Sequence, residues 1–160
     1  RRSVMDTIGL FDESLHYRMD YDYWIRSPVA GLKYQLIEKF LAEYRIHDTS
    51  KSLSQENKFW KDWYTILDKL FAQEDLPEKI ITLKKWAYSY ASYHAGVSLY
   101  YNQQRQDARS YLYTFLKGEG AIQQKIYATI MYIDCVLGTN FTRSVVNGYR
   151  RYKNLPRDDR

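Results

Sequence analysis

Apolar residues after Ser54 follow the pattern of amphipathic helices. They recur three and four residues apart, which places them along one face of a helix. One such stripe consists of Phe59, Trp63, Ile66, Leu67 and Leu70, and the clearest consists of Ile122, Ile126, Ile130, Ile133 and Leu137.

Proline and glycine mark the ends of these expected helices. Pro77 suits the first turn of a helix that extends to about Tyr101. After a break at 102–106, a helix is predicted over 108–116 and a last one over 142–152, with glycines at 118, 120 and 138 as stops. Short connections of this kind predict an antiparallel bundle of about five helices over 55–153, within a helical extension of residues 55–160.

One pair of these helices has the spacing of a single tetratricopeptide hairpin. The positions concerned are Gly96, Leu99, Ala108, Leu112 and Phe115. Stacked repeats need about three copies for stability, and one copy is visible. An ordinary helical hairpin therefore remains the simpler interpretation.

Residues 1–54 change pattern every few positions. A helix is predicted over 20–30, with Asp22 and Arg26 spaced for an i,i+4 ion pair and Gly31 as its stop. Lys33–Ile37 and Phe40–Tyr44 are predicted as two short strands. The fold class expected for the whole chain is α+β, mainly helical.

Composition excludes several classes of protein. The chain is 45% hydrophobic and 17% aromatic, with 17 tyrosines, which is not typical of a disordered chain. No apolar run approaches the roughly 20 residues that cross a bilayer. Cys135 is the only cysteine, so a disulfide framework is excluded and a reducing, cytoplasmic compartment is expected.

The segment from Gly9 to Ser52 carries several motifs in a fixed order. A turn with Gly9, Phe11, Asp12 and Glu13 precedes an acidic helix start with Asp20, Asp22, Trp24 and Arg26. Ala30 and Gly31 follow, and a loop then holds Tyr44, Arg45, His47, Ser50 and Ser52. This order resembles the second half of family-two glycosyltransferase domains, which have the GT-A fold and transfer a sugar with inversion of configuration at the anomeric carbon.

The resemblance implies a role for each motif residue. Asp20 would be the general base that removes a proton from the acceptor hydroxyl. Asp22 would orient the neighbouring loop through Arg26, and Trp24 would help to form the acceptor wall. His47 would lie near the donor diphosphate and a divalent metal, Mg or Mn, in the intact parent enzyme.

The same resemblance implies a missing half. Only 19 residues precede Asp20, too few for the βα unit that binds the nucleotide in this family. We therefore expect residues 1–54 to be the acceptor-side part of a GT-A domain, inactive alone and without its own bound metal. The parent would take a nucleotide-sugar donor and a glycan or lipid-linked acceptor.

The residues by themselves leave other interpretations open. Asp20 is equally suited to cap a helix, and His47 to be a surface loop histidine. Trp24 and Arg26 could be structural, and Asp12 with Glu13 could bind a metal or order a turn.

A second hypothesis makes the chain a helical binding module without catalysis. From Thr139 onward there are six Lys or Arg and two Asp or Glu. A basic amphipathic helix there would contact a partner protein or the inner face of a membrane through Arg143, Arg150, Arg151 and Lys153. Nucleic-acid binding is not expected, because no recognised motif accompanies the charge.

Overall fold

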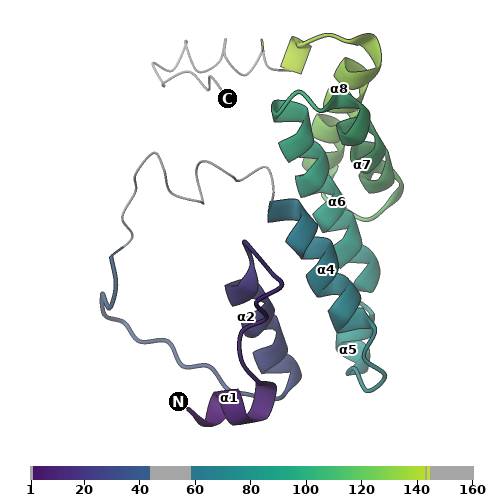
Figure 1. The fold of residues 1–160 in the computed structure, drawn as a ribbon. Coiled ribbons are helices and arrows are strands. Elements are labelled where there is room, and N and C mark those ends of the chain that lie inside the picture. Colours follow the sequence, from purple (N-terminus) through teal and green to yellow (C-terminus); the bar gives the residue numbers. More distant parts are fainter. Residues whose placement is uncertain (1, 44–58, 143, 145–160) are drawn as a thin grey trace. The chain divides into compact units, whose positions relative to one another are not determined.

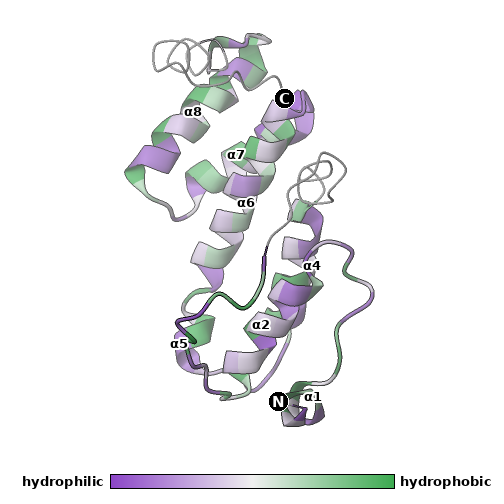
Figure 2. Ribbon diagram, turned by 90° about the vertical axis from the view of Figure 1, so that its left-hand side faces the viewer, coloured by the Kyte–Doolittle hydropathy of each residue, from purple (hydrophilic) through white to green (hydrophobic). Residues whose placement is uncertain are grey.

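The computed structural model describes residues 2–43, 59–142 and 144. Within them the chain is mainly helical and has no strand. It divides into two compact units, Arg1–Thr82 and Leu83–Arg160. Hydrophobic and hydrophilic residues alternate along the helices, as the sequence pattern predicts (Figure 2). No helix in the described ranges is long and apolar enough to cross a membrane.

The first unit contains α1 (Ser3–Ile8), α2 (Met19–Val29), α4 (Phe59–Phe71) and the short α5 (Glu78–Ile81) (Figure 1). This unit extends to Thr82, and the domain boundary expected at residue 54 stays a prediction. Leu15, from the loop before α2, is almost fully buried, as are Ile66 and Leu67 of α4. The apolar stripe predicted in α4 thus supplies part of this core.

Helix α2 ends as its sequence predicts. Gly31 has a φ of 74°, in the left-handed region that favours glycine. Its N–H donates to the Pro28 carbonyl at 3.0 Å, and the Leu32 N–H donates to the Ser27 carbonyl at 3.1 Å. These two bonds form a Schellman motif, which satisfies the last carbonyls of the helix.

The two predicted strands are absent. Residues 33–43 take no strand conformation in the structure, and Tyr44 lies outside the described residues. A strand forms only when a neighbouring segment exchanges backbone hydrogen bonds with it, and no described segment does so here. The apolar side chains of this segment, including Leu36 and Phe40, are exposed instead.

The second unit is built on α6 (Lys84–Tyr101), α7 (Arg105–Lys117) and α8 (Ile122–Leu137), which pack in sequence order. The single helix predicted from Pro77 to Tyr101 is interrupted at Thr82 and Leu83, so α5 and α6 are separate. All five positions of the predicted hairpin are buried between α6 and α7. The hairpin prediction is therefore confirmed.

Helix α8 does not bury the stripe that the sequence made most prominent. Ile122 and Leu137 are 72% and 67% exposed, and Ile126 and Ile133 are also exposed. The buried residues of α8 are Ala128, Met131 and Asp134, on a different face. The apolar pattern locates the helix, but the partner helices determine which face is covered.

Asp134 is a buried carboxylate with a full set of hydrogen bonds. It accepts from the Tyr100 hydroxyl at 2.7 Å, from the Thr139 hydroxyl, and from the backbone N–H groups of Phe141 and Thr142 at 3.1 and 2.8 Å. Burial raises the pKa of Asp134, but these bonds outweigh burial and hold it below the ordinary range. Burial and the bond to Asp134 raise the pKa of Tyr100 to about 12.

We predict that Gly96→Ala destabilises the second unit. A Cβ at Gly96 would lie 2.8 Å from the Cγ and Cδ2 atoms of Leu112. The expected loss is about 1–3 kcal/mol of unfolding free energy, because overpacking outweighs the helix preference of alanine. Urea denaturation measures it, with Ser110→Ala on the exposed face of α7 as the control. A variant more stable than the parent would contradict the close packing.

A second prediction concerns acid stability. The Asp134 bonds contribute fully above the unfolded aspartate pKa of about 3.9, and this contribution is lost as pH falls towards the lower folded pKa. Asp134→Asn should lower the unfolding free energy by about 1–3 kcal/mol at neutral pH, because the amide keeps one acceptor oxygen and the donors on the other carboxylate oxygen lose theirs. The gap to the parent should narrow below about pH 3.9 in urea titrations. Glu119→Gln, at an exposed carboxylate, should follow the parent throughout; a gap independent of pH would refute this account.

Candidate functional site

The start of α2 is held by a carboxylate from α4. Asp62 Oδ2 accepts the backbone N–H groups of Tyr17 at 2.7 Å and Arg18 at 3.1 Å. The Arg18 Nε donates to the Phe59 carbonyl at 3.2 Å. Arg18 is the N-cap residue of α2 and Tyr17 precedes it, so the carboxylate satisfies two backbone donors directly before the helix and lies near the positive end of its dipole. Helix α4 therefore fixes the backbone from which Asp20 projects.

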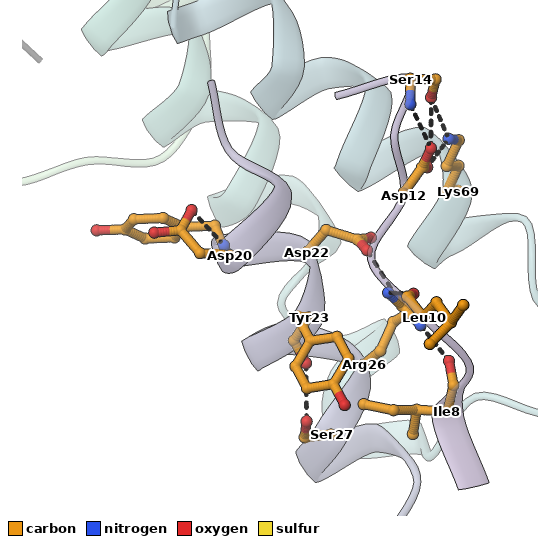
Figure 3. A network of polar contacts seen from close by, with 11 residues as sticks. Ile8, Leu10, Asp12, Ser14, Asp20, Asp22, Tyr23, Arg26, Ser27 and Lys69 are labelled. Carbon is orange, nitrogen blue, oxygen red and sulfur yellow. Dashed lines mark hydrogen bonds and ion pairs between the residues drawn. The ribbon is translucent and has the colours of Figure 1, made fainter. Parts of the chain in front are cut away.

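Asp20 lies in the first turn of α2 and is half-buried. Its Oδ1 accepts the Tyr21 N–H at 2.8 Å. Figure 3 shows its carboxylate on one side of α2, while Asp22 and Arg26 project from the other. Asp20 is thus a positioned carboxylate at a helix start, which suits either a general base or a helix cap.

Asp22 and Arg26 form the ion pair that their spacing predicts. The Arg26 Nε donates to Asp22 Oδ2 at 2.8 Å, and Asp22 is only 5% exposed (Figure 3). The same guanidinium donates to the carbonyls of Ile8 and Leu10, the latter at 3.0 Å. Arg26 therefore fastens the loop after α1 to α2, and Asp22 holds Arg26 in place. Contact between this loop and an acceptor stays a prediction.

Asp12 orders the loop that leads to α2. It forms an ion pair with Lys69 of α4, and its Oδ1 accepts the Ser14 hydroxyl at 2.6 Å and the Ser14 N–H at 3.0 Å. Hydrogen bonds from Lys69 and Ser14 lower the pKa of Asp12 to about 2. Among the described residues, no three His, Cys, Asp or Glu side chains form a group that could hold a metal. Of the two roles open to Asp12, the structure shows the ordering of a turn.

A cavity of about 250 Å³ lies in the first unit beside these two ion pairs. Its charged walls are Asp12, Asp22, Arg26 and Lys69, and its apolar walls include Ile25 and Ile66. Because the charged groups already pair with one another, the cavity carries no uncompensated charge. Asp20 does not line this cavity.

Trp24 is 54% exposed and projects from the middle of α2. Its ring lies 5.4 Å from that of Tyr21, which in turn lies 5.4 Å from that of Trp63 on α4. The indole therefore adds little to the core, and remains available for contact with a ligand.

Five of the predicted site residues lie outside the described part of the chain. They are His47, Arg143, Arg150, Arg151 and Lys153. Asp20, Asp22, Trp24 and Arg26 all lie on α2, but Asp20 is on the side opposite Asp22 and Arg26. The expected pairing of Asp20 with His47 stays a prediction.

Sequence reasoning missed Arg18, Asp62 and Lys69, which connect the predicted motif to α4. Asp62 is separated from its partners by 44 and 45 residues, and Lys69 from Asp12 by 57. No local spacing rule signals contacts across such distances. The sequence shows Asp62 near the start of a helical stretch, but it does not show that Asp62 binds the backbone before α2.

Two curated proteins show partial similarity to this chain. An uncharacterized glycosyltransferase of Methanocaldococcus jannaschii is 42% identical over 48 residues, which are 30% of this chain and 17% of the relative. An uncharacterized glycosyltransferase of Rickettsia typhi is 39% identical over 70 residues, 42% of this chain and 22% of the relative. The matches thus span about a fifth of each relative and indicate a relationship to glycosyltransferases. No protein-family profile matches the chain. No solved structure matches it either.

We predict that Asp62→Ala loosens the start of α2. The amide hydrogens of Tyr17 and Arg18 should exchange about 2–30-fold faster, as expected for loss of a helix cap worth about 0.5–2 kcal/mol. Amide exchange followed by NMR measures this directly. Asp75→Ala, in the exposed loop after α4, is the matched control, and Asp62→Asn should recover part of the protection. Unchanged exchange in Asp62→Ala would show that the two bonds do not hold the helix.

Proposed function

We propose that this chain forms the acceptor-side part of an inverting, nucleotide-sugar-dependent glycosyltransferase of the GT-A type, with Asp20 as its general base. The observation that carries the proposal is the half-buried carboxylate of Asp20 at the start of α2, on a backbone fixed by Asp62. The partial similarity to two glycosyltransferases supports the same class of reaction.

The proposed reaction is a single displacement. The acceptor oxygen attacks the anomeric carbon, and its proton passes to the Asp20 carboxylate. The bond from the anomeric carbon to the diphosphate oxygen breaks, and the diphosphate leaves with the bonding electrons. A positioned base of this kind contributes typically about 10²–10⁴-fold to the rate.

Asp22 and Arg26, on the other side of α2, would hold the neighbouring loop in position. Arg26 binds the carbonyls of Ile8 and Leu10, so the loop before Asp12 has a fixed path. Asp22 keeps the guanidinium in that geometry at 2.8 Å. In the proposal, this loop borders the acceptor, and the donor sugar is bound by a part of the enzyme other than residues 1–54.

The resemblance also implies a divalent metal, Mg or Mn, which would offset the charge of the leaving diphosphate. His47 is the residue of this chain proposed to lie near it, and it is outside the described residues. We propose the metal for the complete enzyme; within the described ranges no three His, Cys, Asp or Glu side chains form a group that could hold it.

The alternative function, a helical module that binds a protein or a membrane surface, is also a proposal. It depends on Arg143, Arg150, Arg151 and Lys153, none of which is described. Liposome flotation separates the two hypotheses: stronger binding to anionic than to neutral vesicles supports the module, and equal binding excludes the membrane contact.

We predict that Asp20→Asn abolishes most of the transfer. In the product of the complete reading frame that contains this chain, kcat should fall by about 10²–10⁴-fold, because the amide cannot accept the proton. The KM for the nucleotide sugar should change little, since Asp20 is proposed to face the acceptor. Release of nucleoside diphosphate from a panel of nucleotide sugars measures both quantities. Asp6→Asn, at an exposed aspartate of α1, is the control, and full activity in Asp20→Asn would refute the proposal.

A further inference from the structure

Next to Asp20 lies a partly exposed group of aromatic rings around a guanidinium, which we call the aromatic ledge: Arg18, Tyr21, Trp24 and Trp63. The Arg18 guanidinium carbon lies 4.9 Å from the Tyr21 ring centroid and 4.5 Å from that of Trp63. The Tyr21 ring lies 5.4 Å from each of the two indoles. Tyr21 is 40% exposed. Tyr21 and Trp24 belong to α2, Arg18 directly precedes that helix, and Trp63 belongs to α4 of the same unit.

A fourth aromatic residue, Tyr34, is bound to this region because of Pro28. In a regular helix the N–H of residue 28 would donate to the Trp24 carbonyl, but proline has no N–H. The Tyr34 hydroxyl donates to that carbonyl instead, at 3.0 Å. Tyr34, which is 64% exposed, is thereby tethered to the backbone of Trp24. Pro28 thus leaves a backbone carbonyl that the Tyr34 hydroxyl uses.

The ledge combines flat apolar faces with polar groups of both charges. Burial lowers the pKa of Arg18, while the Tyr21 hydroxyl and the charges of Asp20 and Asp62 oppose this change. The guanidinium therefore lies among carboxylates, so the site has no excess positive charge with which to bind an anion such as phosphate. Rings with polar groups at their edge suit a neutral ligand that has an apolar face and a rim of hydroxyl groups.

We propose that the aromatic ledge binds a pyranose ring of a glycan acceptor, with the sugar's C–H face on Trp24 and Tyr21. This inference rests on the proposed function, because Asp20 precedes Tyr21 directly and would receive the proton from a hydroxyl of the bound sugar. It narrows the acceptor from a glycan or lipid-linked molecule to one that presents a sugar ring at the site. The Arg18 guanidinium and the Asp20 carboxylate bind hydroxyl groups at the ring's edge.

The first test measures binding to residues 1–160 without any donor. The chain has four tryptophans, so its indole N–H signals in a nitrogen–proton NMR spectrum form a small set that single substitutions assign. The probes are the methyl glycosides of glucose, galactose, mannose, rhamnose and N-acetylglucosamine. We expect saturable shifts of the Trp24 and Trp63 signals with at least one probe. Trp86, 47% exposed in the second unit, is the internal control and should not shift.

Variants then test each part of the ledge. Trp24→Ala should weaken binding at least about tenfold, or roughly 1.4 kcal/mol, whereas Trp86→Ala should leave it unchanged. Tyr34→Phe, which removes only the hydroxyl, should weaken binding by a smaller factor. The proposal is overturned if no probe shifts Trp24 up to roughly 100 mM, a free energy weaker than about −1.4 kcal/mol. It is also overturned if Trp86 shifts equally, or if inorganic phosphate shifts Trp24 more than any sugar.

The second test separates this proposal from the first. In the complete enzyme, Trp24→Ala should raise the KM for the acceptor at least about tenfold while the KM for the donor stays unchanged. If Asp20→Asn abolishes transfer but Trp24→Ala leaves the acceptor KM unchanged, the ledge proposal fails and the transferase proposal stands. If sugars bind the ledge in a Trp24-dependent way but the complete enzyme transfers none, the binding site stands and the transferase proposal fails.

Discussion

The contact on which the first unit depends is the carboxylate of Asp62 against the start of α2. Two backbone N–H groups, from Tyr17 and Arg18, converge on one oxygen of Asp62 at 2.7 and 3.1 Å. The contact fixes where α2 begins and how its first turn faces α4. That placement determines the position of Asp20 and the exposure of Trp24. It also allows Arg18 to pack among the rings of Tyr21, Phe59 and Trp63. Without it, the residues just before α2 would lose two hydrogen bonds to α4.

The second unit uses the same physical device. Asp134 of α8 accepts two backbone N–H groups, from Phe141 and Thr142, where the chain turns helical again. The Tyr100 hydroxyl brings α6 into the same set of bonds. In each unit a carboxylate from one helix accepts backbone N–H groups at the start of another segment. The buried charge of Asp134 is tolerated because its two oxygens accept four hydrogen bonds.

The two faces of α2 have separate roles in this account. On one face, Asp22 and Arg26 hold the preceding loop, and their charges are balanced within 2.8 Å. On the other, Asp20 is half-buried, and Tyr21 and Trp24 of the aromatic ledge are exposed. A rigid, internally paired face behind an open one is what a positioned functional group requires, because the open side chains gain precision from a backbone that cannot shift.

The sequence by itself determined what depends on neighbours within a few residues. The glycine stop of α2 and the ion pair at i,i+4 are local patterns of this kind, and the structure contains both. The hairpin of α6 and α7 was also predictable, because the two helices are consecutive in the chain. Only the tertiary structure decided which apolar face of α8 is covered, that residues 33–43 gain no strand partner, and that Asp62 and Lys69 reach back to α2 and its loop. A helix encodes its own hydrogen bonds, which close within four residues. Burial, strand pairing and a carboxylate cap need a partner dozens of residues away, and such a partner is chosen only when the chain has packed.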